Sequence, residues 1–492
     1  MKKILILGGG LSGLAAGIRA LELGYIPTII EKNEYAGGLC TSYVRNGSIN
    51  DLCIHYLLGI GNEPMKEIYK HFGCLNNASI IKLPYLFRFY YFDKTITVSR
   101  DLNQFKNELL SYAETEDIKE VKRFIKYIKN MEYFPMIAKK STEIMTRFEY
   151  ILTGMSYLKH MPSYSKISRV SIEEYANRFK SDILKSFILS FMPKSFSIVY
   201  LIGLIAKFVT GNADILNISS KDFSYNVLNK YLSLGGKILY NEEVLKLEYN
   251  DNKISKVITK NNSFTDFDFV INAIPLNYFY NNILDEKYRT DLVYKEINDL
   301  DNNKILSSFI VFFEVKKEYS HQIQHYFILN NKNNIDVAGN INPSIGFRSY
   351  DYIHNSDNTI TISAIVDQDY KNYSFWEELK YKSTYEQYKN DKAKELILML
   401  EERFSFLHGL IEISDIITPL SFNKWGNVLY GGYLSNLSTK TSTRGIFEVK
   451  SSYVSNLYHA GQMVYMIGGI VGALINGKFA VEVIDYHNKK SR

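Results

Sequence analysis

The stretch LILGGGLSGLAAG, residues 5–17, decides the fold of this chain. The apolar residues 3–7 predict a buried parallel strand, and residues 12–23 predict a helix that ends before Gly24. A second strand is expected from residue 25 or 26 to residue 31. The glycines therefore lie in the first turn of a βαβ unit, which is a common start for a nucleotide-binding α/β domain.

Three of these glycines, Gly8, Gly10 and Gly13, follow the spacing GxGxxG. Gly8 permits the tight turn from strand to helix, Gly10 lets a diphosphate approach the backbone, and Gly13 lets helix and strand pack closely. Leu11 and Ser12 lie at the helix N-terminus, where free N–H groups can bind phosphate oxygens. The spacing predicts a dinucleotide site, and a plain tight turn is the alternative.

An acidic residue and a second glycine pair follow the second strand. Glu31, with Lys32 beside it, stands where a carboxylate would bind the ribose hydroxyls of an adenosine. Gly37, Gly38 and Leu39 come next. NAD-binding domains have no general need for this pair, whereas in FAD enzymes it lets the backbone pass beside the diphosphate and the ribityl chain. The pair favours FAD, and a surface Gly-Gly turn is the alternative.

The far end of the chain contains a matching stretch, NLYHAGQMVYMIGGIVGALINGKFAVEVI, residues 456–484. It predicts a strand, a turn at Gly461 and Gln462, and a helix that begins at Gly469 and Ile470. Glycine costs up to about 1 kcal/mol relative to alanine inside a helix, so these glycines indicate that something approaches the helix closely. The edge of an isoalloxazine ring would do so, and close helix packing without a cofactor is the alternative.

Composition excludes several other functions. The net charge of +6 is spread along the 492 residues without a block of Lys or Arg, which argues against nucleic acid as a partner. Three cysteines without a CxxC pair predict neither a disulfide framework nor a metal site, and they fit a reducing cytoplasm. No signal peptide is expected at the N-terminus. Abundant Ile, Lys, Asn and Tyr indicate an AT-rich bacterial genome.

The β-rich and helical stretches divide the chain into two domains of an α/β protein. The cofactor domain is expected to be assembled from residues 1–75, 212–275 and 415–492. The substrate domain is expected to take residues 76–211, which are mainly helical, and residues 276–414. The latter hold strands at 306–315, 326–329, 344–350 and 359–366, a loop at 329–344 and a helix at 392–404.

The three glycine-containing blocks together resemble the FAD-dependent family of phytoene desaturases, carotenoid isomerases and retinol saturases, with flavin amine oxidases as distant relatives. Residues 36–59, AGGLCTSYVRNGSINDLCIHYLLG, are especially similar to the retinol saturase-like branch. Residues 227–249 resemble the family's second FAD segment, in which the backbone of Val244 would meet the adenine. Two residues depart from the relatives: Leu39 replaces the arginine usual in amine oxidases, and Gln462 replaces a common aspartate.

The resemblance implies a Rossmann-like FAD domain built from three segments, with an inserted α+β substrate domain. It implies an oxidoreductase that exchanges hydride between flavin N5 and a carbon of a hydrophobic, unsaturated substrate, polyene or isoprenoid-like, as a desaturase or a saturase. His55 is the candidate catalytic residue because it is the titratable group nearest the flavin-side segment in sequence. A structural role for His55 is the alternative.

Two other functions stay open, an amine or porphyrinogen oxidase and a non-redox flavin-dependent isomerase. Only one GxGxxG occurs, so no second domain for NADPH is expected, and oxygen, a quinone or a protein partner remain as electron acceptor or donor.

The longest apolar stretch, SFSIVYLIGLIA at residues 195–206, is bounded by Lys194 and Lys207. It is shorter than the about 18 residues that a membrane-spanning helix needs. It is either a patch that dips into a bilayer or a buried helix of the substrate domain. The protein is accordingly expected in the cytoplasm, or peripherally on the inner face of the membrane.

Overall fold

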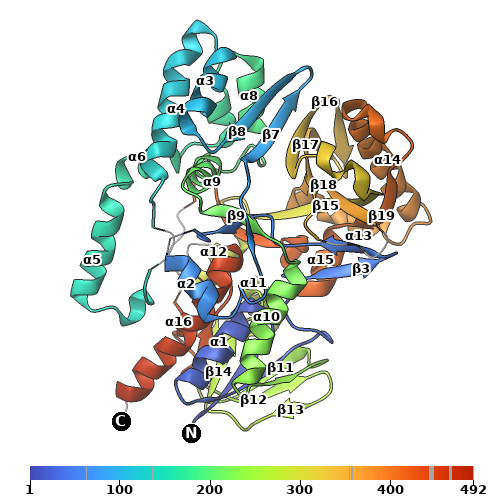
Figure 1. The fold of residues 1–492 in the computed structure, drawn as a ribbon. Helices are drawn as coiled ribbons and strands as arrows, with labels where there is room; N and C mark the ends of the chain where they lie inside the picture. Colours follow the sequence, from blue (N-terminus) through green and yellow to red (C-terminus); the bar gives the residue numbers. More distant parts are fainter. Residues whose placement is uncertain are drawn as a thin grey trace.

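The computed structural model describes residues 1–61, 64–135, 138–353, 355, 358–442, 448–464 and 468–490. Both termini lie at the same end of the molecule, in the half that holds the first and last helices (Figure 1). The mixed α/β architecture with an antiparallel sheet domain, expected from the sequence, is confirmed.

A five-stranded parallel sheet forms the core of that half, in the order β10-β2-β1-β14-β21. Apolar residues on one sheet face pack against helices, and those on the other face pack against a small antiparallel sheet and helix α11. The strands are β1 (Lys3–Leu7), β2 (Ile26–Ile30), β10 (Lys237–Leu239), β14 (Phe269–Asn272) and β21 (Leu457–His459). The helices on the first face are α1 (Leu11–Glu22), α2 (Pro64–His71), α10 (Ser220–Ser233) and α16 (Gly469–Lys490). The second face is covered by β11 (Val244–Asn250), β12 (Lys253–Thr259), β13 (Ser263–Phe264) and α11 (Leu276–Asn282).

Helices α1 and α16 join the two ends of the chain through their backbones. A Cβ atom on Gly477 would lie 2.2 Å from the carbonyl oxygen of Ser12. From the sequence, the glycines of the last helix are expected to make room for a cofactor ring. For Gly477 the approaching group is instead helix α1, so here the alternative of close helix packing holds.

A larger sheet forms the second half, in the order β19-β15-β18-β17-β16-β7-β8, with β20 also paired to β15. One face packs against α13 (Tyr373–Leu379) and α14 (Tyr385–Arg403). The strands are β7 (Tyr85–Tyr91), β8 (Lys94–Ser99), β15 (Asn303–Lys316), β16 (Tyr326–Val337), β17 (Asn340–Ser349), β18 (Thr359–Gln368), β19 (Glu412–Ile417) and β20 (Leu434–Ser438).

This sheet extends one expectation and corrects another. Residues 76–211 are mainly helical as expected, but they also contain β7 and β8, and β7 pairs in parallel with β16. Residues 329–344 are not a loop. They continue β16 and β17 as a hairpin that turns at Ala338 and Gly339. The side chains of Ile335 and Val337 in this hairpin are buried.

A group of helices packs on β7 and forms the upper left of Figure 1. The apolar stretch 195–206 largely forms the buried helix α9, with Leu201, Ile202 and Ile205 in the core, so the second of its two interpretations holds. In the described part of the chain, no helix combines the length and the apolar character needed to cross a bilayer. The helices are α3 (Leu102–Ser111), α4 (Ile118–Met131), α5 (Arg147–Leu158), α6 (Met161–Ile167), α7 (Ile172–Ala176), α8 (Asp182–Leu189) and α9 (Val199–Val209).

The sheet topology also differs from the expected division into domains. The expectation assigned residues 415–492 to the cofactor half, yet β19 and β20 both pair with β15 of the larger sheet. It assigned residues 276–414 to the substrate half, yet Leu276 and Phe279 of α11 pack with strands of the parallel sheet. Strand pairing across hundreds of residues decides these memberships.

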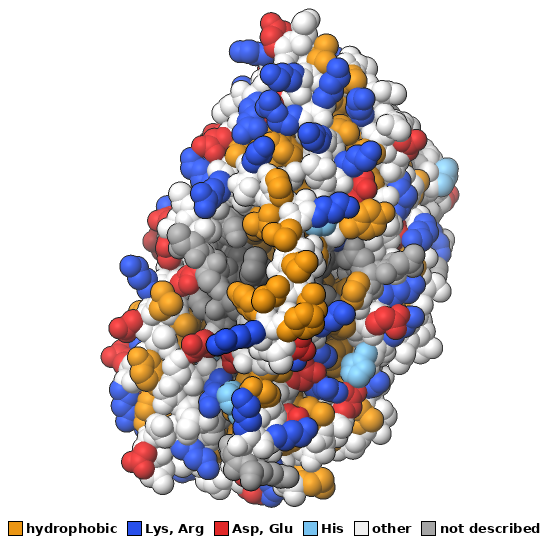
Figure 2. Space-filling model, turned by 90° about the vertical axis from the view of Figure 1, so that its left-hand side faces the viewer, with side chains coloured by type: hydrophobic (Ala, Val, Ile, Leu, Met, Phe, Trp, Pro, Cys, Tyr) orange, Lys and Arg blue, Asp and Glu red, His pale blue; other side chains and the backbone are white. Residues whose placement is uncertain are grey.

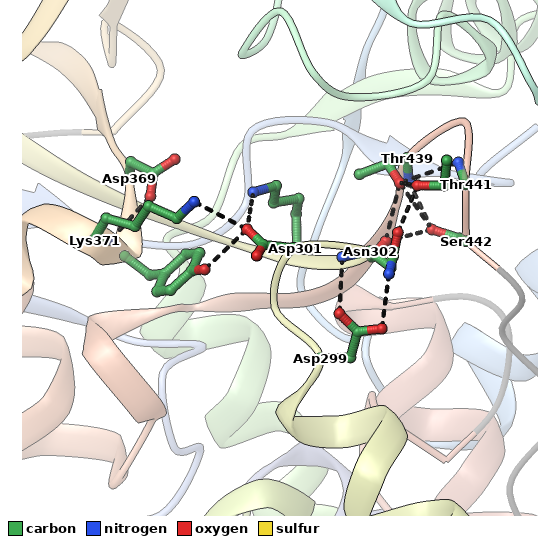
Figure 3. A network of polar contacts seen from close by, with 10 residues as sticks. Asp299, Asp301, Asn302, Asp369, Lys371, Thr439, Thr441 and Ser442 are labelled. Carbon is green, nitrogen blue, oxygen red and sulfur yellow. Dashed lines mark hydrogen bonds and ion pairs between the residues drawn. The ribbon is translucent and has the colours of Figure 1, made fainter.

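The chain passes from the parallel half into the larger sheet through a polar cluster between α12 (Asp291–Asn298) and β15 (Figure 3). The carbonyl oxygen of Asn302 accepts hydrogen bonds from Thr439 and Ser442, which follow β20. The carboxylate of Asp301 pairs with Lys371 at 3.0 Å. These bonds attach the crossing segment to two other parts of the larger sheet's periphery.

We expect Gly477→Ala to lower the stability of the protein by about 1–3 kcal/mol or more, since the new methyl group would overlap the backbone of α1. Gly203→Ala in α9 is the matched control because no atom lies within 4 Å of its added Cβ. There the better helix propensity of alanine should be neutral or stabilise by up to about 1 kcal/mol. Thermal unfolding followed by circular dichroism measures both. A Gly477→Ala protein as stable as the wild type would contradict this packing.

Candidate functional site

A cavity opens at the carboxyl ends of the parallel strands. Gly8 follows β1, Glu31 follows β2, Ala273 follows β14 and Ala460 follows β21, and all four residues line it. The empty space amounts to about 1270 Å³, open solvent at its mouth included. Sites at this edge of a parallel sheet are the general rule for ligands of open α/β folds.

The structure brings the sequence-predicted cofactor residues together around this cavity. All of them line it except Gly13, whose Cβ would lie 2.0 Å from the carbonyl oxygen of Gly8 and which therefore serves the packing of α1 on β1. The lining residues among the predictions are Gly8, Gly10, Leu11, Ser12, Glu31, Lys32, Gly37, Gly38, Leu39, Val244, Gly461, Gln462, Gly469 and Ile470.

The glycine turn presents unused hydrogen-bond donors to one part of the cavity. Helix α1 begins at Gly10, with no side-chain cap and no acidic residue in its first turn. The hydroxyl of Ser12 is buried and has no hydrogen-bond partner. Gly37 lies beside Gly10 and donates its N–H to the carbonyl oxygen of Gly9 at 2.9 Å, so both glycine segments form one narrow wall. This wall fits a diphosphate, because unsatisfied N–H groups at a helix N-terminus bind anions.

Glu31 lies at the adjoining part of the cavity. Its carboxylate accepts hydrogen bonds from the backbone N–H of Gly9 at 2.8 Å and from Asn33 at 2.9 Å. Burial raises the pKa of Glu31, and these hydrogen bonds oppose that rise. Lys32 reaches across the cavity mouth to the carbonyl oxygen of Lys424 at 2.8 Å and to Asn427 at 2.6 Å. The Glu31 carboxylate is thus held in place at the cavity, and Lys32 attaches the end of α15 (Pro419–Gly426) to the same segment.

Gln462 connects the last strand with the start of α16. Its amide nitrogen donates to the carbonyl oxygen of Tyr433 at 2.9 Å, and its amide oxygen accepts from the N–H of Gly469 at 3.0 Å. The expected hydrogen bond to ribityl hydroxyls would have to use the remaining N–H of this amide. Tyr433 and Cys53 line the same part of the cavity, and sequence reasoning did not select either.

Asp51 anchors the segment that follows the second glycine pair. Its buried carboxylate accepts hydrogen bonds from the N–H of Ser220 at 2.6 Å and from the N–H of Cys53 at 3.2 Å. The hydroxyl of Ser220 in turn accepts from the N–H of Ile54 at 2.8 Å. Burial raises the pKa of Asp51, and the bonds to Ser220 oppose it. Asp51 therefore ties the cavity wall to the start of α10.

Beyond Tyr433 lies a group of polar side chains that we call the Asp367 cluster: Tyr433, Ser308 and Asp367. The hydroxyl of Tyr433 lies 2.9 Å from that of Ser308. Asp367 faces Ser308 in the register of β15 and β18, so both point to the same side of the sheet. Desolvation raises the pKa of Asp367 to about 7, and a hydrogen bond with Ser308 opposes the rise. Asp367 can therefore gain or lose a proton near neutral pH.

Arg348 lies on the same face of the sheet and is 2% exposed. Its guanidinium donates to the carbonyl oxygen of His55 at 2.9 Å, and its Cζ lies 4.8 Å from the ring centre of Tyr56 and 4.5 Å from that of Tyr326. Its Nε is buried without a hydrogen-bond partner. Among the described residues, no carboxylate forms an ion pair with Arg348. The charges of Arg348 and of the buried Asp51 carboxylate attract one another without a direct ion pair.

His55 does not line the cavity, and its backbone carbonyl makes the contact with Arg348. Burial, then the charge of Arg348 and the neighbouring His325, hold the pKa of His55 well below its usual range. The imidazole is therefore neutral at physiological pH. A catalytic role for His55 stays a prediction. Asp367 titrates closer to neutrality and is connected to Tyr433 of the cavity wall through Ser308, although neither Asp367 nor Ser308 lines the cavity.

Sequence reasoning missed Asp367, Ser308 and Arg348, which lie on three strands of the larger sheet. The available signal was a charged residue in each of two apolar strands, IVDQ at 365–368 and GFRS at 346–349. Among the described residues, no group of three His, Cys, Asp or Glu side chains could hold a metal ion.

Comparisons with known proteins agree with this architecture. Residues 6–72 match the model of an NAD(P)-binding Rossmann-like domain. The chain is 22% identical to the 4,4'-diaponeurosporene oxygenase of Staphylococcus haemolyticus, over 98% of this chain and 97% of that protein. It is 22% identical to the 1-hydroxycarotenoid 3,4-desaturase of Flavobacterium sp., over 99% and 100% of the two chains.

Solved structures share the fold over nearly the whole chain. An oxidoreductase from Methanosarcina mazei matches with a TM-score of 0.60 and 15% identity, over 98% of this chain and all of the other. A putrescine oxidase variant matches with a TM-score of 0.62 and 12% identity, over 99% of each chain. The similarity to two full-length carotenoid enzymes and the Rossmann-like match together support a relationship to carotenoid desaturase-like FAD-type oxidoreductases.

Proposed function

We propose that this protein binds FAD and exchanges hydride between the flavin and a carbon of a hydrophobic, unsaturated substrate, polyene or isoprenoid-like. The observation that carries the proposal is the cavity at the carboxyl ends of the parallel strands, which residues from both ends of the chain line. One part of this cavity is lined by the first turn of α1, with the unpartnered Ser12 hydroxyl and the first N–H groups of the helix. Another part adjoins the Asp367 cluster at Tyr433.

Different residues would bind different parts of the cofactor. The turn from Gly8 to Ser12 would bind the diphosphate, Glu31 the adenosine ribose, and Val244 the adenine. Gly461, Gly469 and Ile470 would lie against the ring. When bound, FAD supplies a hydride acceptor or donor, and the protein supplies binding, orientation and a proton partner.

Removal of hydrogen from a CH–CH unit releases one hydride and one proton. If the cofactor takes the hydride, the carboxylate of Asp367 would accept the proton through the hydroxyls of Tyr433 and Ser308, because Asp367 does not itself line the cavity. In the saturase direction the protonated Asp367 would return it. A pKa of about 7 suits both directions, because neither form is rare near neutral pH.

Arg348 favours this substrate class over a protonated amine. Tyr56 and Tyr326 form an aromatic pair of the kind that binds cations, but the guanidinium of Arg348 already occupies it. The positive charge of Arg348, on the same sheet face as Asp367, would repel an ammonium group there. The carotenoid names of the two full-length relatives support the same choice.

The direct test is anaerobic incubation of the FAD-loaded protein with polyenes and isoprenoids. We expect loss of the oxidised flavin absorption and a product that lacks one pair of hydrogens, or the converse with reduced flavin. A product of unchanged mass would indicate an isomerase. Rapid oxidation of amines in air would indicate an oxidase. A protein that takes up no FAD would overturn the proposal.

Ser12→Ala should weaken FAD binding about tenfold or more, because a hydrogen bond to a charged phosphate oxygen is lost. The stability of the FAD-free protein should be unchanged or slightly higher, since the hydroxyl is buried without a partner. Ser219→Ala is the control. It removes the N-cap of α10 and should cost about 0.5–2 kcal/mol of stability without weakening FAD binding. Equal FAD affinity of Ser12→Ala and wild type would exclude the assigned diphosphate contact.

Asp367→Asn should remove a pH-dependent limb of turnover that is centred near pH 7. The limb rises with pH in the dehydrogenating direction, since the carboxylate is then the active form, and falls with pH in the reverse direction. Turnover at the optimum should fall about 100-fold or more. A retained limb in the Asn variant would assign the titration to another group.

A second effect of the same substitution concerns stability. The pKa of Asp367 is about 7 in the folded protein and 3.8 when fully hydrated, so the folded state binds the proton more tightly. Ionisation of Asp367 therefore destabilises the fold as pH rises from about 4 to 7. Asp367→Asn should raise the melting temperature at pH 8 and leave it nearly unchanged at pH 4. Equal effects at both pH values would contradict the raised pKa.

A further inference from the structure

Helix α5 presents its apolar side to solvent. Phe148, Ile151, Leu152, Met155 and Leu158 follow the spacing of one helix face, and each is between 48% and 69% exposed. None of the residues of α5 is buried. In a helix packed on a core this spacing would mark the inward side. Here the helix is held from its other side, where the Tyr157 ring packs at 5.5 Å from that of Phe134.

Figure 2 shows hydrophobic side chains running down the middle of this face of the molecule, with Lys and Arg side chains around them. Exposed Met161 of α6 continues the apolar surface. We call this set the α5 face: Phe148, Ile151, Leu152, Met155, Leu158 and Met161. An apolar surface of this extent on a soluble monomer marks an interaction site.

Most charged side chains beside the upper part of this apolar strip are Lys or Arg, while Asp and Glu side chains also lie below it (Figure 2). Two acids near α5 in sequence are engaged within the protein: Glu149 pairs with Lys140 at 2.7 Å, and Glu143 accepts from the backbone N–H of Lys450 at 3.4 Å. Several exposed basic residues form no ion pair with any other described residue. They are Lys139, Arg147, Lys159, Lys166 and Arg169.

This charge pattern favours an anionic lipid surface over a second copy of the chain as the partner of the α5 face. In a symmetric dimer the same surface meets itself, so two α5 faces would bring unpaired positive charges together. An anionic lipid surface instead offers apolar chains to the helix face and negative headgroups to the surrounding Lys and Arg side chains.

We infer that α5 lies in the plane of an anionic lipid bilayer, with the α5 face embedded at the boundary between headgroups and chains. This contact goes beyond the proposed reaction and does not depend on it. It differs from the earlier sequence hypothesis, which placed a membrane patch at residues 195–206, most of which lie in the buried helix α9.

Vesicle flotation tests the contact with the full chain. The wild type should float with vesicles of phosphatidylcholine and phosphatidylglycerol, and less with pure phosphatidylcholine or at high salt. The double variant Ile151→Glu/Met155→Glu should lower the partition coefficient about tenfold or more. Leu292→Glu on α12 is the matched control, because its side chain is 71% exposed outside the α5 face, and it should float like the wild type. Equal melting temperatures show that all variants are folded.

A separate variant tests how much the positive charges contribute to vesicle binding. Lys159→Gln should weaken binding to the anionic vesicles about fivefold and leave binding to neutral vesicles unchanged. Wild type that stays unbound with both vesicle types would overturn the inference. So would a dimer in sedimentation velocity that Ile151→Glu/Met155→Glu dissociates, since the second copy would then be the occupant.

Discussion

The contact between the backbones of α1 and α16 is the constraint on which the rest of the site depends. It brings the last helix against the first βαβ unit at the level of Ser12 and Gly477. A side chain at position 477 would separate the two, because its Cβ would overlap the backbone of the other helix. Only with this contact do Gly8 and Gly10 of the first turn line the same cavity as Gly461 and Gly469.

The cavity joins two electrostatic environments. At the glycine turn, unsatisfied N–H groups and the Ser12 hydroxyl favour negative charge. On the larger sheet, Arg348 is a buried cation without a carboxylate partner among the described residues, and Asp367 holds its proton unusually tightly. Two carboxylates, Glu31 in the cavity lining and Asp51 behind it, are each fixed by backbone N–H groups and so serve as rigid acceptors.

Local patterns sufficed to predict the first βαβ unit, whose strands and helix lie within about one residue of the expected ranges. They also selected the glycines and Glu31 that line the cavity, because each has a steric or polar reason that is visible within a few residues. The hairpin at 329–344 was missed since its Asn-rich sequence has low strand propensity, and pairing with a neighbouring strand overrides that preference. Asp367 and Arg348 could not be assigned to the site, because the face on which they lie depends on registers with β15 and β16.

The order of the parallel sheet has a consequence for biosynthesis. Its central strands come from residues 3–7 and 269–272, but the edge strand β21 and the covering helix α16 are translated last. During synthesis the glycine turn is therefore made long before β21 and α16, which complete one wall of the cavity. A nucleotide held as proposed would gain its full set of contacts only after α16 is made, and a product truncated before β21 would leave an apolar sheet surface open to chaperones and proteases.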